Sequence, residues 1–248
     1  MARVLVLAGT TEATELATEL EAHGTEVISS FAGVTSTRRS RPGRIRTGGF
    51  GGVAGLEQYL TDEGIDALVD ATHPFAARMP FNAARAAAAV GVPRCRVLRP
   101  PWLPTVGDRW VSVPDLAAAH DAVHSLGART VFLSTGRQSI GPFASDTDLQ
   151  LVVRSIEPPE GLPSSAAVVL SRGPFNVDDE CQLLQSHAVD VVVTKNSGGD
   201  ATAAKLVAAR QLQLPVVMIE RPPQPNGPIV ETVDLALSWL TTVICRRA

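Results

Sequence analysis

The sequence predicts an α/β protein built from two Rossmann-like domains whose parallel sheets face a cleft. Short β-branched runs alternate with stretches rich in Ala, Leu and Glu, and this alternation is typical of repeated strand–helix units. Three prolines within residues 100–104 interrupt it, because proline neither continues a helix nor occupies a central strand. The 248 residues suffice for two such domains, which we place at residues 1–101 and 102–248.

The first domain begins with an apolar run that predicts a strand. A glycine at position 24 ends the first helix, and Pro80 interrupts the third helix or delays its start. The expected strands are residues 4–8, 26–31, 66–71 and 94–99, and the expected helices are residues 12–22, 56–63 and 75–90.

The second domain repeats the alternation. The expected strands are residues 130–134, 149–156, 167–170, 189–193 and 216–219, and the expected helices are residues 116–126, 177–187, 201–212 and 233–240. Parallel sheets of this kind bind ligands at the carboxyl ends of their strands. The loops directly after strands are therefore where we expect the functional residues.

The composition favours a small-molecule partner. The formal charge is −3 and the aromatic residues are 7 Phe, 3 Trp and 1 Tyr, so the chain lacks the basic excess and the stacking surface typical of nucleic-acid binding. No stretch approaches the ~18 apolar residues of a membrane span, and the N-terminus does not resemble a signal peptide. Three widely spaced cysteines and unclustered histidines indicate neither disulfides nor a metal site. We expect a cytoplasmic monomer or weak homo-oligomer.

The first strand-to-helix turn is a candidate phosphate site. It reads Ala-Gly-Thr-Thr-Glu at residues 8–12, with one glycine where the dinucleotide fingerprint has three. A helix N-terminus directly after a strand still offers N–H groups and a favourable dipole to a phosphate. We therefore assign Gly9, Thr10, Thr11 and Glu12 to cofactor binding. The alternative is that Thr11 only caps the helix.

The second strand favours NADPH over NADH. An NAD-binding domain carries an acid about 20 residues after the glycines, but residues 29–33 read Ser-Ser-Phe-Ala-Gly. The following loop instead supplies five guanidinium groups suited to a 2′-phosphate. They belong to Arg38, Arg39, Arg41, Arg44 and Arg46. We assign Ser30, Arg38 and Arg39 to the cofactor, against the alternative of a solvated arginine surface.

Two further turns carry candidate residues of the first domain. Residues 48–52 hold four glycines around Phe50, so Gly49 and Phe50 either approach a ligand or Phe50 packs into the core. Thr72 and His73 follow a strong strand, with Pro74 suited to begin the next helix. His73 is the histidine we expect in the site, as a proton donor or a hydrogen-bond partner. The remaining histidines are assigned structural roles on helix faces or ends: His23, His120, His124 and His187.

In the second domain, residues 194–200 form a polar glycine turn between a strand and a helix. Lys195 is one of only two lysines in the chain, and it can bind an anion or donate a proton if burial lowers its pKa. Arg137 and Arg172 also follow strands and are expected on the same edge. The edge as a whole is suited to a polyanion, although an ordinary strand–helix loop is the alternative.

Four motifs together are similar to those of the precorrin-6A reductase family of cobalamin biosynthesis. They are Ala-Gly-Thr-Thr-Glu at 8–12, Gly-Arg-Ile-Arg-Thr-Gly-Gly-Phe at 43–50, Asp-Ala-Thr-His-Pro-Phe-Ala at 70–76 and Thr-Lys-Asn-Ser-Gly-Gly at 194–199. The resemblance runs nearly end to end. It implies NADPH-dependent reduction of one double bond of the precorrin-6A macrocycle, giving precorrin-6B, while the related cobalt-pathway enzyme reduces a cobalt-bearing analogue.

The positions of the candidate residues after strands, together with the reaction that this resemblance implies, predict their roles. His73 and Lys195 are the expected catalytic residues, and Thr72 joins the cofactor-binding group. The expected substrate-binding residues are Gly49, Phe50, Arg137, Arg172, Asn196, Ser197 and Gly198. Two alternative functions stay open: a sensor that binds a dinucleotide without turnover, and a reductase of a smaller anionic substrate. It also stays open whether residues 194–200, which we call the lysine turn, bind the cofactor pyrophosphate instead of the substrate.

Overall fold

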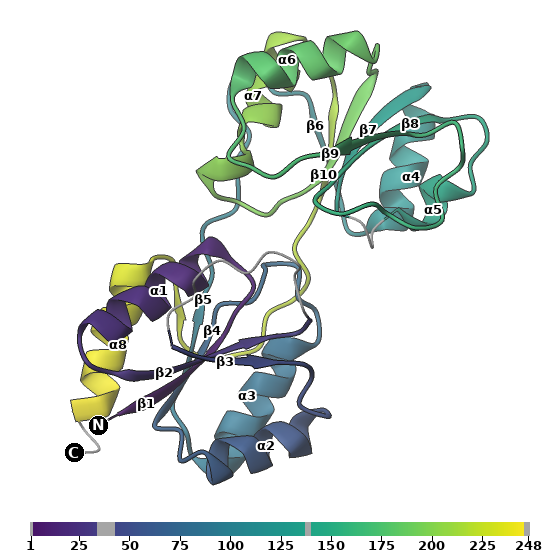
Figure 1. The fold of residues 1–248 in the computed structure, drawn as a ribbon. Coiled ribbons are helices and arrows are strands. Elements are labelled where there is room, and N and C mark those ends of the chain that lie inside the picture. The colour runs from purple at the N-terminus through teal and green to yellow at the C-terminus, as the bar shows by residue number, and fades with distance from the viewer. Residues whose placement is uncertain (1, 34–42, 137–139, 246–248) are drawn as a thin grey trace. The chain divides into compact units, whose positions relative to one another are not determined.

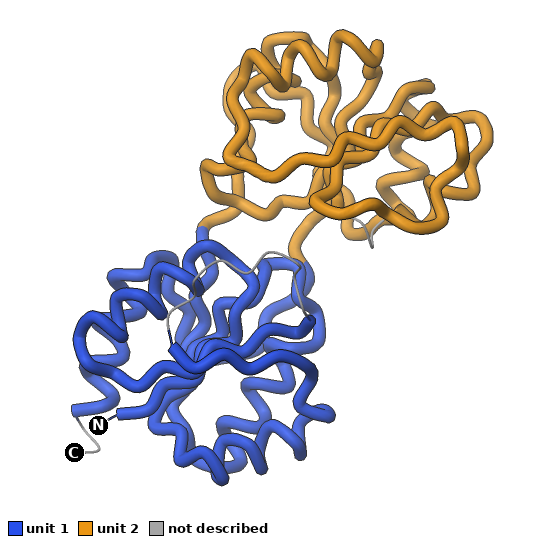
Figure 2. The backbone as a smooth tube through the Cα atoms, in the orientation of Figure 1, with its two compact units in different colours: residues 1–99, 222–248 blue, residues 100–221 orange. Residues whose placement is uncertain are grey.

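The computed structural model describes residues 2–33, 43–136 and 140–245. The chain forms two compact units, residues 1–99 with 222–248 and residues 100–221 (Figure 2). The division after Arg99 lies close to the boundary expected from the proline cluster. The C-terminal boundary differs, because residues 222–248 belong to unit 1 and not to the second domain as the sequence analysis placed them.

Unit 1 contains a six-stranded sheet in the order β12-β5-β4-β1-β2-β3, with every pair parallel (Figure 1). The strands are β1 (Arg3–Leu7), β2 (Glu26–Phe31), β3 (Arg44–Thr47), β4 (Ala67–Asp70), β5 (Arg94–Val97) and β12 (Ile229–Val230). Helices cover both faces of this sheet, so β4 and almost all of β1 are buried, as their continuous apolar sequences predict.

The helices of unit 1 pack in two pairs. α1 (Thr11–Ala22) and α8 (Val233–Cys245) cover one face, and α2 (Val53–Asp62) and α3 (Met79–Val90) cover the other (Figure 1). α8 buries Ala236 and Leu240 in the same cluster as β1 and α1, and β12 pairs with β5. These contacts explain why the C-terminal segment returns to unit 1. The four prolines within residues 222–228 mark this second crossover in the sequence.

Unit 2 repeats the architecture with the strand order β6-β11-β10-β7-β8-β9, again all parallel. The strands are β6 (Trp110–Val113), β7 (Thr130–Ser134), β8 (Gln150–Ser155), β9 (Ala167–Leu170), β10 (Val191–Lys195) and β11 (Val216–Ile219). α6 (Val177–Ser186) and α7 (Ala204–Gln211), preceded by the 3₁₀ turn η1 (Asp200–Thr202), pack on one face. Figure 1 shows α4 (Leu116–Ser125) and α5 (Gly141–Ala144) on the other side.

The two-sheet α/β fold predicted from the sequence is thus confirmed, with local differences. The strands β6 and β12 and the short helix α5 were not expected from the sequence. β3 occupies residues that were expected to form an arginine-rich loop, since Arg-Ile-Arg-Thr pairs along β2. α3 begins only at Met79, with Pro80 in its first turn. Proline is tolerated there because a backbone N–H in the first turn has no acceptor within the helix. Pro74 therefore does not begin the helix. None of the described helices has both the length and the apolar character needed to cross a bilayer.

Candidate functional site

Two turns lie side by side in unit 1: the first strand-to-helix turn, residues 8–12, and the turn that carries His73, residues 72–76, which we call the histidine turn. β1 and β4 are neighbours, with Leu7 opposite Asp70, so the turns that follow them leave the sheet together. A Cβ added to Gly9 would lie 3.5 Å from the His73 nitrogen and 3.6 Å from the Thr72 Cα. These are van der Waals distances, so the two turns lie in close contact at position 9.

Thr10, not Thr11, caps α1. The Thr10 hydroxyl accepts a hydrogen bond from the Ala13 N–H at 3.3 Å and donates one to the Ala71 carbonyl oxygen at 3.0 Å. The alternative interpretation from the sequence was right about a cap but wrong about the residue. Thr11 and Glu12 begin the helix, where backbone N–H groups have no acceptor within the helix itself. A helix N-terminus, whose dipole is favourable for an anion, therefore lies beside the histidine turn.

Glu12 and Arg99 form an ion pair at this helix terminus. Arg99 Nη1 lies 3.0 Å from both carboxylate oxygens of Glu12. Burial raises the pKa of the Glu12 carboxyl, but backbone hydrogen bonds and Arg99 outweigh it, so the pKa lies below its ordinary value. The negative charge of Glu12 is thus balanced within unit 1, which reduces its repulsion of a phosphate.

The histidine turn rests on a buried ion pair that the sequence analysis missed. Asp70 and Arg96 occupy paired positions at the ends of β4 and β5, and both side chains are fully buried. Asp70 Oδ1 accepts hydrogen bonds from the Thr72 N–H at 3.0 Å and from the Thr72 hydroxyl at 2.7 Å. Thr72 is therefore held by the protein core. An acid ending one apolar strand and an arginine within the next strand were the signal in the sequence.

The His73 ring is oriented by its own turn. His73 Nδ1 accepts a hydrogen bond from the Phe75 N–H at 3.2 Å, and the His73 carbonyl oxygen accepts one from the Ala76 N–H at 2.8 Å. Because Nδ1 is an acceptor, a neutral ring carries its proton on Nε2. The half-buried ring can therefore donate one hydrogen bond in a fixed direction.

Arg46 takes a position that the sequence analysis had given to its neighbours. It lies on β3, and its guanidinium donates to the Ser30 hydroxyl at 3.4 Å and to the Gly48 and Gly49 carbonyl oxygens at 2.6 and 2.8 Å. It also stacks on Phe50, 3.7 Å from the ring centroid. This places a half-buried positive charge beside Ser30, at the end of β2 where an NAD-binding domain would carry an acid.

The remaining residues of the predicted arginine cluster divide into two groups. Arg44 lies on β3 and pairs with Glu63 at 2.7 Å, so it has a structural partner. Arg38, Arg39 and Arg41 lie outside the described residues.

Phe50 packs edge-on against Tyr59 with 5.2 Å between the ring centroids and joins the α2–α3 core cluster. The structure therefore favours the structural interpretation of Phe50.

At the carboxyl edge of the second sheet, Lys195 is the last residue of β10 and is half-buried. Burial lowers the pKa of its ammonium group below the ordinary value. Arg172 is exposed just after β9, while Arg137 lies outside the described residues. β9 and β10 are separated by β7 and β8, so their ends are ~14 Å apart. Lys195 and Arg172 therefore cannot contact the same small group, but they suit well-separated anions.

The residues after Lys195 bind the chain's own crossover segments. The Asn196 side-chain amide accepts a hydrogen bond from the Trp102 N–H at 2.8 Å and donates one to the Trp102 carbonyl oxygen at 3.0 Å. Arg221 donates to the carbonyl oxygens of Asn196 and Ser197 at 2.8 and 3.1 Å. Gly198 has a φ of +68°, and an added Cβ would lie 2.0 Å from the Pro100 carbonyl oxygen. These contacts give Asn196 and Gly198 structural roles within unit 2.

Taken together, the first unit carries a helix N-terminus beside an oriented histidine, and the second carries a lysine at the carboxyl edge of a parallel sheet. Turns of this kind at the carboxyl edges of parallel sheets are typical of α/β enzymes that bind a dinucleotide. The chain belongs to the precorrin-6x reductase family, whose model, described as "Precorrin-6x reductase CbiJ/CobK", matches residues 3–241.

Individual relatives agree over nearly their full length. The chain is 47% identical to the precorrin-6A reductase of Rhodobacter capsulatus, covering 97% of this chain and 96% of that protein. It is 28% identical to the cobalt-precorrin-6A reductase of Priestia megaterium, covering 93% and 95%. A solved structure titled "CobK precorrin-6A reductase" superposes with a TM-score of 0.90 at 46% identity, covering 98% and 97%. The family resemblance noted from the motifs is confirmed.

Proposed function

We propose that this protein is an NADPH-dependent reductase that converts precorrin-6A to precorrin-6B by reducing one double bond of the macrocycle in cobalamin biosynthesis. The observation that carries this proposal is the 47% identity to the R. capsulatus precorrin-6A reductase along nearly all of both chains. Identity to the P. megaterium cobalt-precorrin-6A reductase is only 28%. We therefore propose metal-free precorrin-6A as the substrate, in preference to its cobalt-bearing analogue.

The residues at the first sheet edge fit a nicotinamide dinucleotide. The N–H groups that begin α1, at Thr11 and Glu12, are suited to the pyrophosphate, and Arg99 balances the Glu12 carboxylate beside them. Gly9, which has no side chain, is proposed to let that group approach the backbone closely. The cofactor, when bound, supplies the hydride, and the protein supplies binding and orientation.

The preference for NADPH is argued from Ser30 and Arg46. Ser30 is a buried residue near the end of β2 and presents no carboxylate that would repel a 2′-phosphate. Arg46 holds its guanidinium next to the Ser30 hydroxyl. A guanidinium forms two parallel hydrogen bonds with a phosphate, whereas it gains much less from an uncharged ribose hydroxyl. Arg38 and Arg39 remain further candidates of the same kind.

His73 has a positioning role in this proposal. Its Nδ1 accepts the Phe75 N–H, so the Nε2–H of the neutral ring is the group proposed to contact the nicotinamide or its ribose. The conjugated macrocycle accepts the electron pair of the delivered hydride, so a strong acid or base in the protein is not required. The main requirement is then that cofactor and substrate are held in a reactive orientation, which is catalysis by proximity.

Lys195 and Arg172 are proposed to bind carboxylates of the substrate. A precorrin carries acetate and propionate groups around its rim, so widely separated cations match it better than a compact cluster. Lys195 is half-buried, which strengthens its attraction for a carboxylate by reducing solvent screening. Asn196, Ser197 and Gly198 support this lysine through the contacts of the crossover segments.

The test is anaerobic turnover with both macrocycles. NADPH oxidation should proceed with a higher kcat/KM for precorrin-6A than for cobalt-precorrin-6A, and mass spectrometry should find a product two hydrogens heavier. A higher kcat/KM for the cobalt-bearing compound would refute the substrate assignment. Tight NADPH binding without turnover of either compound would favour the sensor that the sequence alone left open.

A further inference from the structure

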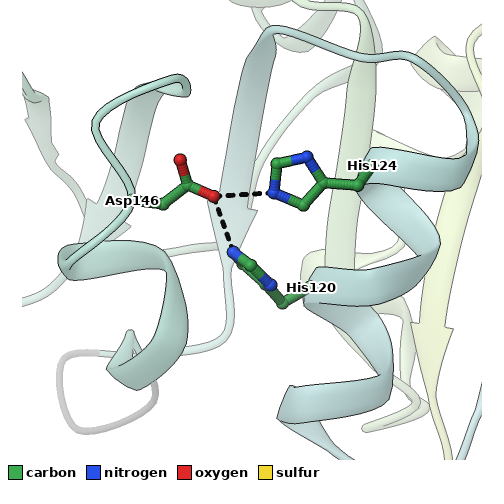
Figure 3. A group of neighbouring side chains, drawn as sticks. All are labelled: His120, His124 and Asp146. Atoms are coloured by element: carbon green, nitrogen blue, oxygen red, sulfur yellow. Dashed lines mark hydrogen bonds and ion pairs between the residues drawn. The ribbon is translucent and has the colours of Figure 1, made fainter.

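Two histidines and one aspartate of unit 2 converge on one point, away from the turns described above. His120 and His124 are one helical turn apart on α4, so their side chains leave the same side of the helix. Asp146 lies between α5 and β8. Figure 3 shows the two rings and the carboxylate directed toward one another. From the sequence, both histidines were assigned structural roles because they fall on a predicted helix.

The potential ligand atoms are close enough to bind one ion. Asp146 Oδ2 lies 2.7 Å from His120 Nε2 and 2.7 Å from His124 Nε2. One ligand atom from each of the three residues lies within 4.8 Å of the others. Ligands about 2.0–2.2 Å from a tetrahedral zinc ion are roughly 3.3 Å from each other. Small side-chain movements are therefore sufficient to admit an ion.

The protonation state of the cluster is compatible with metal exchange. A carboxylate oxygen that accepts hydrogen bonds from two imidazoles requires a proton on each Nε2. A divalent cation would take the place of the two Nε2 protons, and each neutral imidazole would then carry its proton on Nδ1.

Neighbouring groups contact Asp146 and His120. Asp146 Oδ1 accepts the Asp148 N–H at 2.9 Å, which directs Oδ2 to the histidines. The His120 ring packs edge-on against the buried Phe143, with 5.2 Å between the ring centroids. His120 Nδ1 lies 3.9 Å from a carboxylate oxygen of Asp121, which can balance the Nδ1–H of a metal-bound imidazole.

The cluster lies at the opposite edge of the sheet from Lys195. His124 is in the last turn of α4, which leads to the amino end of β7, and Asp146 precedes the amino end of β8. Lys195 ends β10 and is therefore at the carboxyl edge. A cation here would link α4 to the segment before β8 rather than take part in the reduction.

We propose that His120, His124 and Asp146 form a binding site for one zinc-class divalent cation, with water completing the coordination. Two imidazole nitrogens and one carboxylate oxygen are a usual zinc ligand set, and they are less suited to Ca²⁺ or Mg²⁺, which prefer oxygen ligands. The ion stabilises the folded state by binding it selectively.

The experiment is calorimetric titration of the chelator-treated full-length protein with Zn²⁺ alone, with Mg²⁺ as a second probe. One Zn²⁺ per chain should bind and raise Tm, and Mg²⁺ should do neither at the same concentration. His124→Ala and Asp146→Asn should each weaken Zn²⁺ binding at least tenfold and abolish the rise in Tm. His187→Ala, which removes a histidine at the end of α6, is the matched control and should bind Zn²⁺ as the wild type does.

His124 is the main test position because its side chain is 44% exposed, so its removal should leave the fold intact. Circular dichroism of the metal-free variants checks this. As an independent readout, Co²⁺ bound to the wild type should show the intense visible absorption of a four-coordinate site, and His124→Ala should lose it. Unchanged Zn²⁺ affinity in both ligand variants, or no Zn²⁺ binding by the wild type, would overturn the proposal.

Discussion

Asp70 and Arg96 form an ion pair within the core of unit 1 in which both side chains are 0% exposed. The pair connects the sheet to the histidine turn. Asp70 also accepts two hydrogen bonds from Thr72, and Arg96 donates one to the His73 carbonyl oxygen at 3.5 Å. The position of His73 thus depends on charges that no ligand would touch.

Removal of one partner of this pair should be strongly destabilising. Arg96→Met leaves the Asp70 carboxylate buried without its counter-charge, so the free energy of unfolding should fall by about 3–5 kcal/mol. Urea unfolding measures the loss. Asp70→Asn combined with Arg96→Met removes both charges and should recover part of it. A loss for Arg96→Met no larger than for the exposed-pair variant Arg44→Met would contradict the role of the buried pair.

Arg46 is expected to determine the preference for NADPH. Arg46→Ala should lower NADPH affinity by roughly 10- to 150-fold, about 1.5–3 kcal/mol, because a charge-assisted contact is lost, while NADH affinity changes much less. Fluorescence titration with both cofactors measures the ratio. Arg44→Ala is the control on the same strand, since Arg44 pairs with Glu63. An equal loss for both cofactors would indicate that Arg46 only maintains the 48–50 loop.

His73 should contribute to turnover without being indispensable. His73→Ala is expected to lower kcat by less than about 10⁴-fold, because a hydrogen-bond partner contributes less than an obligatory proton-transfer group. In His73→Asn the side-chain oxygen can still accept the Phe75 N–H, so this variant separates loss of the ring from disruption of the turn. A larger fall in both variants, with cofactor affinity intact, would assign His73 the proton transfer.

Lys195 should act on the substrate and not on the cofactor. Lys195→Ala removes a half-buried ammonium at the end of β10, so KM for the precorrin should rise while the Kd for NADPH stays unchanged. Calorimetric titration without substrate separates the two. Weakening of NADPH binding by tenfold, about 1.4 kcal/mol, would place the lysine turn in the cofactor site. Gly198→Ala is unsuited to this question, because its Cβ would collide with the Pro100 carbonyl oxygen.

The sequence predicted local elements well because their signals are local. The apolar run of β1, the Gly24 turn and the proline cluster at 100–104 each act within a few residues, and the structure has the corresponding features. The return of α8 to unit 1 was mispredicted, since the partner of α8 is α1, more than 200 residues earlier. Composition alone does not specify which sheet a terminal helix covers.

In the candidate site, too, local features could be predicted from the sequence and long-range pairings could not. Its turns could be located because parallel strands end at one edge, which is a property of the fold class. The side chains that pair with Asp70 and with Ser30 could not be predicted, because each pair depends on which strands are neighbours and on their register. Arg46 illustrates this: the sequence suggested a loop cation, but strand pairing with β2 is what brings it to Ser30.

Lys205 predicts a specific pH dependence of stability. Its ammonium group is buried, donates to the Thr202 carbonyl oxygen at 2.6 Å and lies 4.6 Å from the centroid of the Trp102 ring. Burial lowers its pKa from 10.5 to about 7, against the attraction of Glu180. Between these two values the unfolded chain binds a proton that the folded chain lacks, so the free energy of unfolding should rise with pH.

The rise attributable to Lys205 between pH 7 and pH 9 should be about 2 kcal/mol. Above pH 9 the opposite contribution of Cys95 begins, because burial raises its pKa to about 12 and ionisation then favours the unfolded chain. Urea unfolding at pH 7, 8 and 9 measures the effect. Lys205→Met removes the titrating group, so this variant should gain on the wild type at pH 7 and lose that advantage progressively by pH 9. A constant difference between the two proteins across this range would show that Lys205 does not change its charge on folding.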